Sequence, residues 1–310
     1  MAGNSAPARN AGLALAEQMI EAHGGAALWN QLDTVRVRAA FGGTGFRMKL
    51  RKVPIRATII VRRGGQHVTL EPYPSTGRQG VFEGSEVRIE SADGRVLSRR
   101  AQPRRAFGDF RHLLWWDALD LLYFAGYAMW TYLCVPFVFT DPVYELHPAG
   151  TWQEGGDTWR KLHVRFPSGI HTHSRDQVLY ADQRGRIVRH DYTAEPFGAW
   201  ARAAHYSTGH QDFNGLVVPT RRRVHPRRAD GSPRPHPTLV WINVEDVAVA
   251  AGNHCLPAES GRRPLVSIYA CGPARMCRRR RPDQVLPADV SGTDGRLTLT
   301  CRQGVSWVHD

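Results

Sequence analysis

The sequence predicts a mainly β fold: a strongly curved antiparallel sheet, or half-barrel, wrapped around a long apolar helix. Three observations support this. Short segments of alternating apolar and polar residues recur from Thr34 to Val249. One long apolar run, residues 112–139, interrupts them. Glycine and proline are plentiful, with 30 and 20 residues, as expected where many turns join short strands.

The apolar run, His112–Phe139, predicts one long buried helix. At about 100° per residue, Leu122, Met129 and Trp130 fall within one broad arc. Pro136 lacks a backbone donor, so the helix should end shortly before it and residues 135–139 should begin a strand. A membrane span is the alternative, because residues 121–139 carry no charge and approach the roughly 20 residues that a span needs. The position of Pro136 and the acidic residues at the head of the run argue against a span.

The polar and aromatic side chains of this helix have two interpretations, which the sequence leaves open. They belong to the packed core, or they line a ligand cavity, because pockets are mostly apolar and aromatic. The candidate ligand-binding residues are Trp115, Tyr123, Tyr127, Trp130, Asp117, Asp120 and Tyr206.

Asp117 and Asp120 lie one turn apart on this mostly apolar helix, and buried carboxylates need partners. We expect them to pair with Arg104 or Arg111. The functional alternative makes one of them an acid with a raised pKa inside the cavity.

The remaining elements follow from periodicity and turn residues. Residues 11–23 and 26–32 fit helices, and residues 199–206 fit either a helix or a strand. Pro219 suggests that its strand lies at an edge of the sheet. The organisation expected is a flexible terminus (1–10), a single domain (11–251) and a poorly structured tail (252–310). The strands predicted are 34–40, 46–52, 56–63, 66–70, 81–82, 86–90, 95–97, 143–147, 158–166, 171–181, 186–193, 216–224 and 238–249.

The formal net charge of +13 permits contact with nucleic acid or an anionic membrane surface. No helix-turn-helix, zinc-finger or RNA-binding signature is present, so nucleic acid is not an expected partner. The five cysteines include no C-x-x-C pair, which argues against a zinc site. The first residues are small and polar, and Glu17 breaks the following apolar stretch, so we expect a cytoplasmic protein.

Four histidines could carry chemistry if the sheet curls far enough to bring them together. His171 and His173 are two residues apart on a predicted strand and should share one face. Three of them (His171, His173, His190) could hold a divalent metal that activates water. Without metal, one histidine would act as a general base oriented by a nearby aspartate. The candidate catalytic residues are His171, His173, His190, His205, Asp176 and Asp191.

The element order resembles the LolA/LolB-like half-barrel, the fold of lipoprotein carriers and many uncharacterised relatives. The resemblance covers residues 11–249. It rests on the opening segment AEQMIEAHGGAALWNQLDTVRVRAAF and on the late strands NGLVVPTRRRV and LVWINVEDV. The block WWDALDLLYFAGYAMWTYL also resembles a group of actinobacterial proteins of no assigned function. Folds of this kind hold an acyl chain or another apolar molecule between sheet and helix.

Two functions therefore follow from the sequence. The first is binding of a small apolar ligand, an acyl chain or an aromatic molecule, in a cavity between sheet and helix. The second is hydrolysis of an ester or lactone with an apolar tail by the histidine–aspartate group, with or without metal. No H-E-x-x-H, G-x-S-x-G or Walker-type motif is present, and the sequence does not set the oligomeric state.

Overall fold

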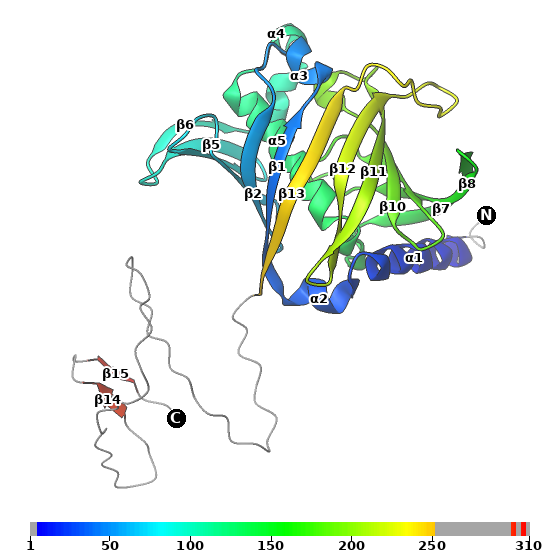
Figure 1. Cartoon of the computed structure of the whole chain (residues 1–310), viewed down its shortest axis with the longest axis horizontal. Helices are drawn as coiled ribbons and strands as arrows, with labels where there is room; N and C mark the ends of the chain where they lie inside the picture. The colour runs from blue at the N-terminus through cyan, green and yellow to red at the C-terminus, as the bar shows by residue number, and fades with distance from the viewer. Residues whose placement is uncertain (1–4, 252–298, 302–304, 308–310) are drawn as a thin grey trace. The chain divides into compact units, whose positions relative to one another are not determined.

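The computed structural model describes residues 5–251, 299–301 and 305–307, and the chain separates into two units, 1–255 and 256–310 (Figure 1). In the second unit, the described residues form two short antiparallel strands, β14 (Leu299–Cys301) and β15 (Val305–Trp307). The predicted poorly structured tail lies almost wholly outside the described residues. In the predicted flexible terminus, residues 5–10 belong to helix α1 (Ser5–Ala22).

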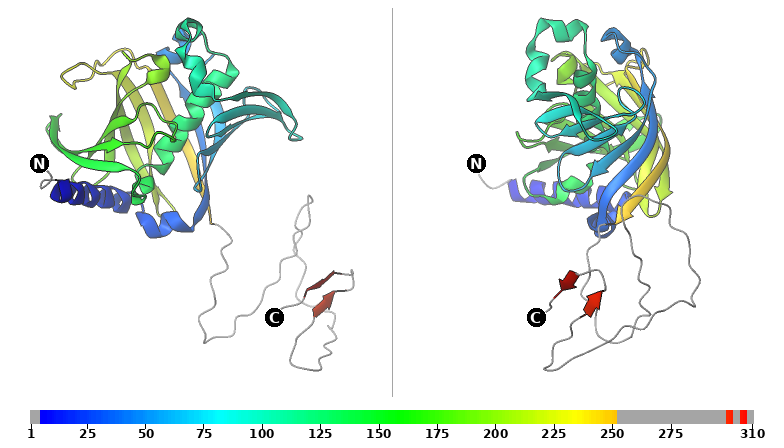
Figure 2. Two further views of the ribbon diagram at one scale, coloured as in Figure 1. Left: turned by 180° about the vertical axis from the view of Figure 1, so that it is seen from behind. Right: turned by 90° about the vertical axis from the view of Figure 1, so that its left-hand side faces the viewer.

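A single antiparallel sheet of thirteen strands organises the first unit, in the order β6-β5-β4-β3-β2-β1-β13-β12-β11-β10-β9-β8-β7. The first and last of these strands, β1 (Leu32–Gly42) and β13 (Val240–Ala251), pair in the middle of the sheet. The outer strands β6 and β7 do not meet, so the sheet is curved and unclosed (Figure 2). The predicted fold class is confirmed.

Two meanders extend from this central pair, one on each side. The first runs through β2 (Ile55–Arg62), β3 (His67–Glu71), β4 (Arg78–Glu83), β5 (Glu86–Ser91) and β6 (Val96–Ala101). The second runs through β12 (Leu216–Pro226), β11 (Arg202–Phe213), β10 (Ile187–Thr193), β9 (Asp176–Ala181), β8 (Asp157–Arg165) and β7 (Glu145–Glu154).

The alternation in β1 shows why these residues form strands. Val35, Val37 and Ala39 are buried, while Arg36 and Arg38 point to solvent. Successive side chains of a strand point to opposite faces, so one face of the sheet is apolar along its length. That face must be covered, and most of the cover comes from one helix.

Helix α5 (Ala118–Cys134) crosses the concave face of the sheet (Figure 2). It is buried on every side, with Leu122, Tyr123 and Tyr127 at 0% exposure. Gly126 lets the helix backbone approach β4, because a Cβ at this position would collide with the side chain of Phe82. The helix is therefore the centre of the main core.

The N-terminal helices cover the lower end of the sheet in Figure 1. Helix α1 places Leu15 and Met19 in a second apolar cluster with Leu146 of β7 and Leu162 of β8. Helix α2 (Gly25–Gln31) places Trp29 flat against Phe137, with ring centroids 4.3 Å apart.

The helix predicted from residue 112 to shortly before Pro136 is instead two helices, α4 (Phe110–Leu114) and α5. Residues 135–139, where a strand was expected to begin, lead into a 3-10 helix, η2 (Phe137–Thr140). The break before α5 has a clear cause: Asp117 and Asp120 form a reciprocal capping box that satisfies the first free backbone N–H groups. The helix ends before Pro136, as expected.

Residues 46–52, predicted as a strand, instead begin within the short helix α3 (Thr44–Met48) and continue past its end. Phe46 turns inward, and its ring contacts Phe41 and Phe124 at centroid distances of 6.1 and 5.8 Å. Pro219 was expected on an edge strand, but β12 is internal. Its pairing with β13 is confined to residues 221–224, so Pro219 lies where one side of the strand has no partner.

The strand predicted over residues 171–181 begins only at Asp176. His171 and His173 therefore belong to the segment that precedes β9. The ambiguous residues 199–206 lead into β11, which begins at Arg202.

Candidate functional site

Two tyrosines of α5 hold the segment that precedes β9 against the helix. The Tyr123 hydroxyl lies 2.8 Å from His171 Nδ1, and the Tyr127 hydroxyl lies 3.2 Å from His173 Nδ1. The two tyrosines are four residues apart and share one helix face. The helix thus positions both histidines.

A buried polar network continues from His173 onto the inner face of the sheet. The Tyr132 hydroxyl lies 2.7 Å from His173 Nε2 and 3.0 Å from the Tyr192 hydroxyl. The His173 ring stacks on Tyr192 at a centroid distance of 3.9 Å. We call this set the histidine–tyrosine network; its members are His173, His190, His205, Tyr127, Tyr132 and Tyr192.

Burial keeps this network uncharged. It lowers the pKa of His190 to about 3 and holds the pKa values of His173 and His205 well below their usual range. Burial also raises the pKa of the Tyr192 hydroxyl well above its usual value. At neutral pH the network therefore consists of neutral imidazoles and phenols.

The network has no carboxylate to orient a general base. Among the described residues, none of its three histidines forms an ion pair with Asp or Glu. Asp176 contacts His163 at 3.2 Å and is exposed, and Asp191 lies on the other face of β10. Both ring nitrogens of His173 face tyrosine hydroxyls, and a pKa far from neutrality makes a poor base. The geometry gives no support to the hydrolase alternative.

No three His, Cys, Asp or Glu side chains within the described part of the chain are grouped so that they could hold a metal ion. His171, His173 and His190 are used instead in hydrogen bonds to Tyr123, Tyr127 and Gln177. These residues do not fit a metal ligand set.

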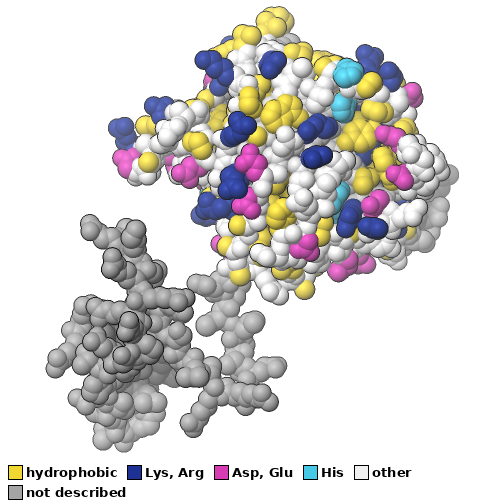
Figure 3. All heavy atoms as spheres, viewed as in Figure 1, with side chains coloured by type: hydrophobic (Ala, Val, Ile, Leu, Met, Phe, Trp, Pro, Cys, Tyr) yellow, Lys and Arg dark blue, Asp and Glu magenta, His cyan; other side chains and the backbone are white. Residues whose placement is uncertain are grey.

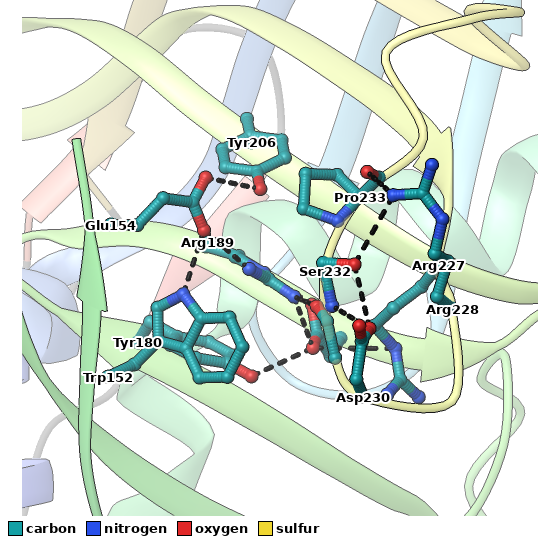
Figure 4. Close-up of polar contacts among 12 residues, drawn as sticks. Trp152, Glu154, Tyr180, Arg189, Tyr206, Arg227, Arg228, Asp230, Ser232 and Pro233 are labelled. Atoms are coloured by element: carbon teal, nitrogen blue, oxygen red, sulfur yellow. Dashed lines mark hydrogen bonds and ion pairs between the residues drawn. The ribbon is translucent and has the colours of Figure 1, made fainter.

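Asp191 and Tyr206 belong to a separate cluster on the outer face of the sheet, centred on Arg189 (Figure 4). Arg189 has 0% exposure. It donates to both oxygens of Asp191 at 2.8 and 2.9 Å and to Glu154 at 2.7 Å. Tyr206 donates to the same Glu154 at 2.6 Å. This charge is fully paired.

Aromatic rings and a loop close the Arg189 cluster from solvent. The guanidinium lies 4.7 Å from the Tyr180 ring centroid and 5.1 Å from that of Trp152. The loop after β12 adds the Gly231 carbonyl, which accepts from Arg189 at 2.5 Å (Figure 4). The cluster therefore holds β7, β10 and the loop after β12 together on the outer face of the sheet, and it leaves no opening for a ligand.

The carboxylates at the head of α5 pair with Arg100, where Arg104 or Arg111 was expected. Arg100 donates to Asp117 at 2.6 Å and also contacts Asp120. Burial opposes ionisation of Asp117, but the hydrogen bonds from Arg100 outweigh it and hold its pKa below the usual value. Burial raises the pKa of Asp120.

Arg104 and Arg111 have other partners. Arg104 donates to the Thr172 carbonyl at 2.7 Å, and the guanidinium of Arg111 lies 5.0 Å from the centroid of the Trp115 ring. Trp115 is 37% exposed and lies outside the helix. Trp130 is buried and donates to the Gly65 carbonyl at 2.8 Å. Of these two predicted ligand-binding residues, Trp115 is therefore partly exposed to solvent and Trp130 is part of the core.

An apolar pocket of about 420 Å³ lies between the sheet, α5 and the loop that joins β10 to β11. Its wall includes one residue of α5, Phe124, and one member of the histidine–tyrosine network, Tyr192. The lining residues that matter here are Phe124, Tyr192, Phe197, Trp200, Ala203 and Leu239. A pocket of this volume with mostly apolar walls is typical of small-molecule sites.

Two exposed apolar side chains mark the mouth of this apolar pocket: Trp200 is 69% exposed and Met48 is 58% exposed. In Figure 3, hydrophobic side chains gather at the end of the molecule where α3 and α4 lie in Figure 1. Basic side chains on that face are interspersed with acidic ones and do not form one broad patch (Figure 3).

Sequence reasoning missed most of the pocket wall. Phe197, Trp200 and Leu239 come from loops and strand ends, where no periodicity marks a buried face. Only their residue type could have drawn attention to them.

No family model matches the chain, and no curated protein sequence matches it. Several solved structures resemble it. A DUF1329 family protein from Desulfovibrio piger has a TM-score of 0.45 and 13% identity, over 80% of this chain and 95% of that one. A LolA superfamily protein from Nitrosomonas europaea has a TM-score of 0.44 and 11% identity, over 79% and 94%. An outer membrane lipoprotein-sorting protein domain from Vibrio parahaemolyticus has a TM-score of 0.44 and 10% identity, over 80% and 95%.

The curved, unclosed antiparallel sheet around α5 has the half-barrel form that the resemblance to LolA/LolB-like proteins implied. The solved structures overlap too little with this chain, in identity and in TM-score, to assign a residue role. The cytoplasmic location expected from the sequence is contradicted, because these neighbours include a domain described as outer membrane lipoprotein-sorting. In residues 5–251, no helix combines the length and apolar character needed to cross a bilayer.

Proposed function

We propose that the protein binds a small apolar molecule, an acyl chain or an aromatic compound, in the apolar pocket. The observation that carries the proposal is the pocket itself: about 420 Å³, walled by Phe124, Phe197 and Leu239, with Trp200 at its mouth. Removing apolar surface from water is worth about 25 cal/mol per Å², so a ligand that fills the pocket gains affinity mainly from burial.

The polar groups near the pocket favour binding over chemistry. Tyr192, which lines the pocket, is neutral and bonded to Tyr132. The nearest titratable groups of the histidine–tyrosine network are held neutral as well. A ligand in the pocket meets apolar and aromatic side chains together with Arg202, Arg227 and Arg234, and the pocket wall contains no His, Asp or Glu that could act as a general acid or base.

The test is equilibrium binding of the neutral fluorescent probe N-phenyl-1-naphthylamine. We expect saturable binding to the wild type with one site. Ala203 is 2% exposed and lines the pocket, so the substitution Ala203→Trp should fill the space and weaken binding by roughly tenfold or more.

The matched control is Ala101→Trp, on the exposed edge strand β6, which should leave probe binding unchanged. Circular dichroism would confirm that both variants keep the β signal. Equal probe affinity in Ala203→Trp and the wild type would contradict the proposed site.

A further inference from the structure

Arg222, in the middle of β12, is a buried cation on the inner face of the sheet. It is 7% exposed. Its Nη1 donates to Ser207 Oγ at 3.1 Å, and its Nη2 donates to the Tyr132 carbonyl at 3.0 Å. The guanidinium lies 4.9 Å from the Tyr132 ring centroid. An arginine has five N–H donors, so these two bonds leave most of its capacity unused.

No carboxylate among the described residues forms an ion pair with Arg222. Arg189 differs in this respect. Both arginines are buried in the same sheet, on opposite faces. Asp191 and Glu154 neutralise Arg189, whereas burial lowers the pKa of Arg222 to about 10 and only tyrosines lie close enough to oppose this. Leaving a buried charge unpaired costs several kcal/mol.

A small cavity of about 30 Å³ adjoins Arg222, beside the second half of α5. Besides apolar side chains, its wall contains His23, Thr131, Tyr132, His190, Ser207 and Arg222 and includes no acidic residue. Burial lowers the pKa of His23 to about 4, and the positive charge of Arg222 contributes to this. The cavity is therefore small, and Arg222 makes its polar wall positive.

We propose that Arg222 binds a carboxylate group in this cavity, either that of a small free acid or the head of an acyl chain. The planar guanidinium matches the two oxygens of a carboxylate, and the bound anion would supply the missing counter-charge. The apolar walls, from Leu133, Leu179 and Val218, suit the carbon atoms next to the carboxylate.

This carboxylate cavity is distinct from the apolar pocket. Thr131 to Leu133 of α5 line the cavity, whereas Phe124 lines the apolar pocket almost two turns earlier. The proposal therefore does not require that the apolar pocket be filled, and the two can be tested separately.

The first test uses the wild-type full-length chain with N-phenyl-1-naphthylamine at saturation, so that the apolar pocket is occupied, and calorimetric titration with sodium acetate, sodium octanoate and 1-octanol. We expect saturable binding of at least one of the two acids, and octanoate should bind roughly tenfold or more tightly than octanol. Saturable acetate binding identifies a small free acid as sufficient, whereas binding of octanoate alone identifies an acyl chain. Octanol binding as tightly as octanoate, or no saturable binding of either acid, would overturn the proposal.

The second test compares Arg222→Met with Arg221→Met. Arg221 is exposed and adjacent on the strand, so its side chain points to the other face and the substitution removes the same charge. We expect Arg222→Met to lose roughly tenfold or more in affinity for the bound acid, and Arg221→Met to retain it.

Binding of N-phenyl-1-naphthylamine by both variants would show that the fold and the apolar pocket are intact. A loss of acid binding can therefore be told apart from a loss of binding in the apolar pocket. Equal acid affinity in Arg222→Met and the wild type would refute the role of Arg222. If Arg222→Met does not fold, the wild-type comparison of octanoate with octanol still decides the matter.

Discussion

Tyr132 links helix α5 to several buried side chains of the sheet. Its hydroxyl joins His173 to Tyr192, its ring lies against His205 at a centroid distance of 4.5 Å, and its carbonyl accepts from Arg222. Tyr132 lines the carboxylate cavity, and its hydroxyl bonds that of Tyr192, which lines the apolar pocket. A ligand in either space would therefore contact Tyr132 or its hydrogen-bond partner.

The buried histidines make stability depend on pH. His23 and His190 have pKa values lowered to about 4 and about 3, chiefly by burial, whereas an unfolded chain titrates near 6.5. As the pH falls below about 6.5, the unfolded state takes up protons that the folded state does not bind. The folded protein should thus be most stable above pH 6.5 and lose about 1 kcal/mol or more per histidine towards pH 4.

Urea unfolding followed by circular dichroism between pH 4 and pH 7.5 measures this dependence. The variant His190→Gln keeps an amide that can bond Gln177 but carries no titratable group. Its free energy of unfolding should change less steeply with pH than that of the wild type. Identical slopes would show that His190 is not held neutral by burial.

For single residues, the sequence predicted some of the side chains that face the interior, among them His190 and His205. Pairing of β10 with β11 brings His190 opposite His205. The sequence left this pairing open, because residues 199–206 fit either a helix or a strand. Strand alternation also explains why Asp191 and Tyr206, each adjacent to an inward histidine, point outward. Phe197 and Trp200 could not be placed, because their positions depend on loop geometry and not on a repeating pattern.

Helix α5 shows how an element is set by its ends as well as by its apolar face. Hydrophobicity predicted a helix through residue 115, but the capping box at Asp117 begins a new helix and leaves Trp115 in an extended connection. A local hydrogen-bonding pattern overrides hydrophobic continuity here. The cap also places both carboxylates beside Arg100.

Close approach between α5 and β4 depends on Gly126. The substitution Gly126→Ala favours helix formation, yet its Cβ would collide with Phe82 in a buried layer. We therefore expect a net loss of about 1–3 kcal/mol in the free energy of unfolding, measured by urea denaturation.

Gly108→Ala is the matched control, because nothing lies within 4 Å of a Cβ at that position. It should change stability by less than about 0.5 kcal/mol. A Gly126→Ala variant as stable as the wild type would show that the helix can move away from β4 at little cost.

In the first unit as a whole, the sheet is held together by its first and last strands. β1 pairs with β13 over residues 32–42 and 241–251, and this central pair joins the two meanders. A chain ending at residue 255 keeps both strands, so it should retain the β circular-dichroism signal and the melting temperature of the full chain.

A chain ending at residue 238 loses β13 and separates the meanders, so we expect it to be unfolded or aggregated. The comparison of the two truncations isolates the contribution of β13. A cooperative melting transition in the shorter chain would contradict the central role assigned to the β1–β13 pair.

The sheet as a whole could be predicted because alternation repeats in strand after strand, as in Val35, Val37 and Ala39. The order of the elements then suggested a sheet curved around one helix. The segment at Phe46 was mistaken for a strand because a short amphipathic stretch fits both periods. Its true conformation depends on the contact of Phe46 with Phe124 and on the hydrogen bond from Gly45 to the Leu239 carbonyl, and both partners are distant in sequence.

The central claim is that an apolar ligand occupies the space beside Phe124. A crystal structure of the protein soaked with 12-bromo-1-dodecanol, with anomalous data at the bromine edge, tests this most directly. The account predicts a bromine peak within the apolar pocket, bounded by Phe124, Phe197 and Leu239. Bromine found only on the outer surface, or none at saturating ligand, would contradict it.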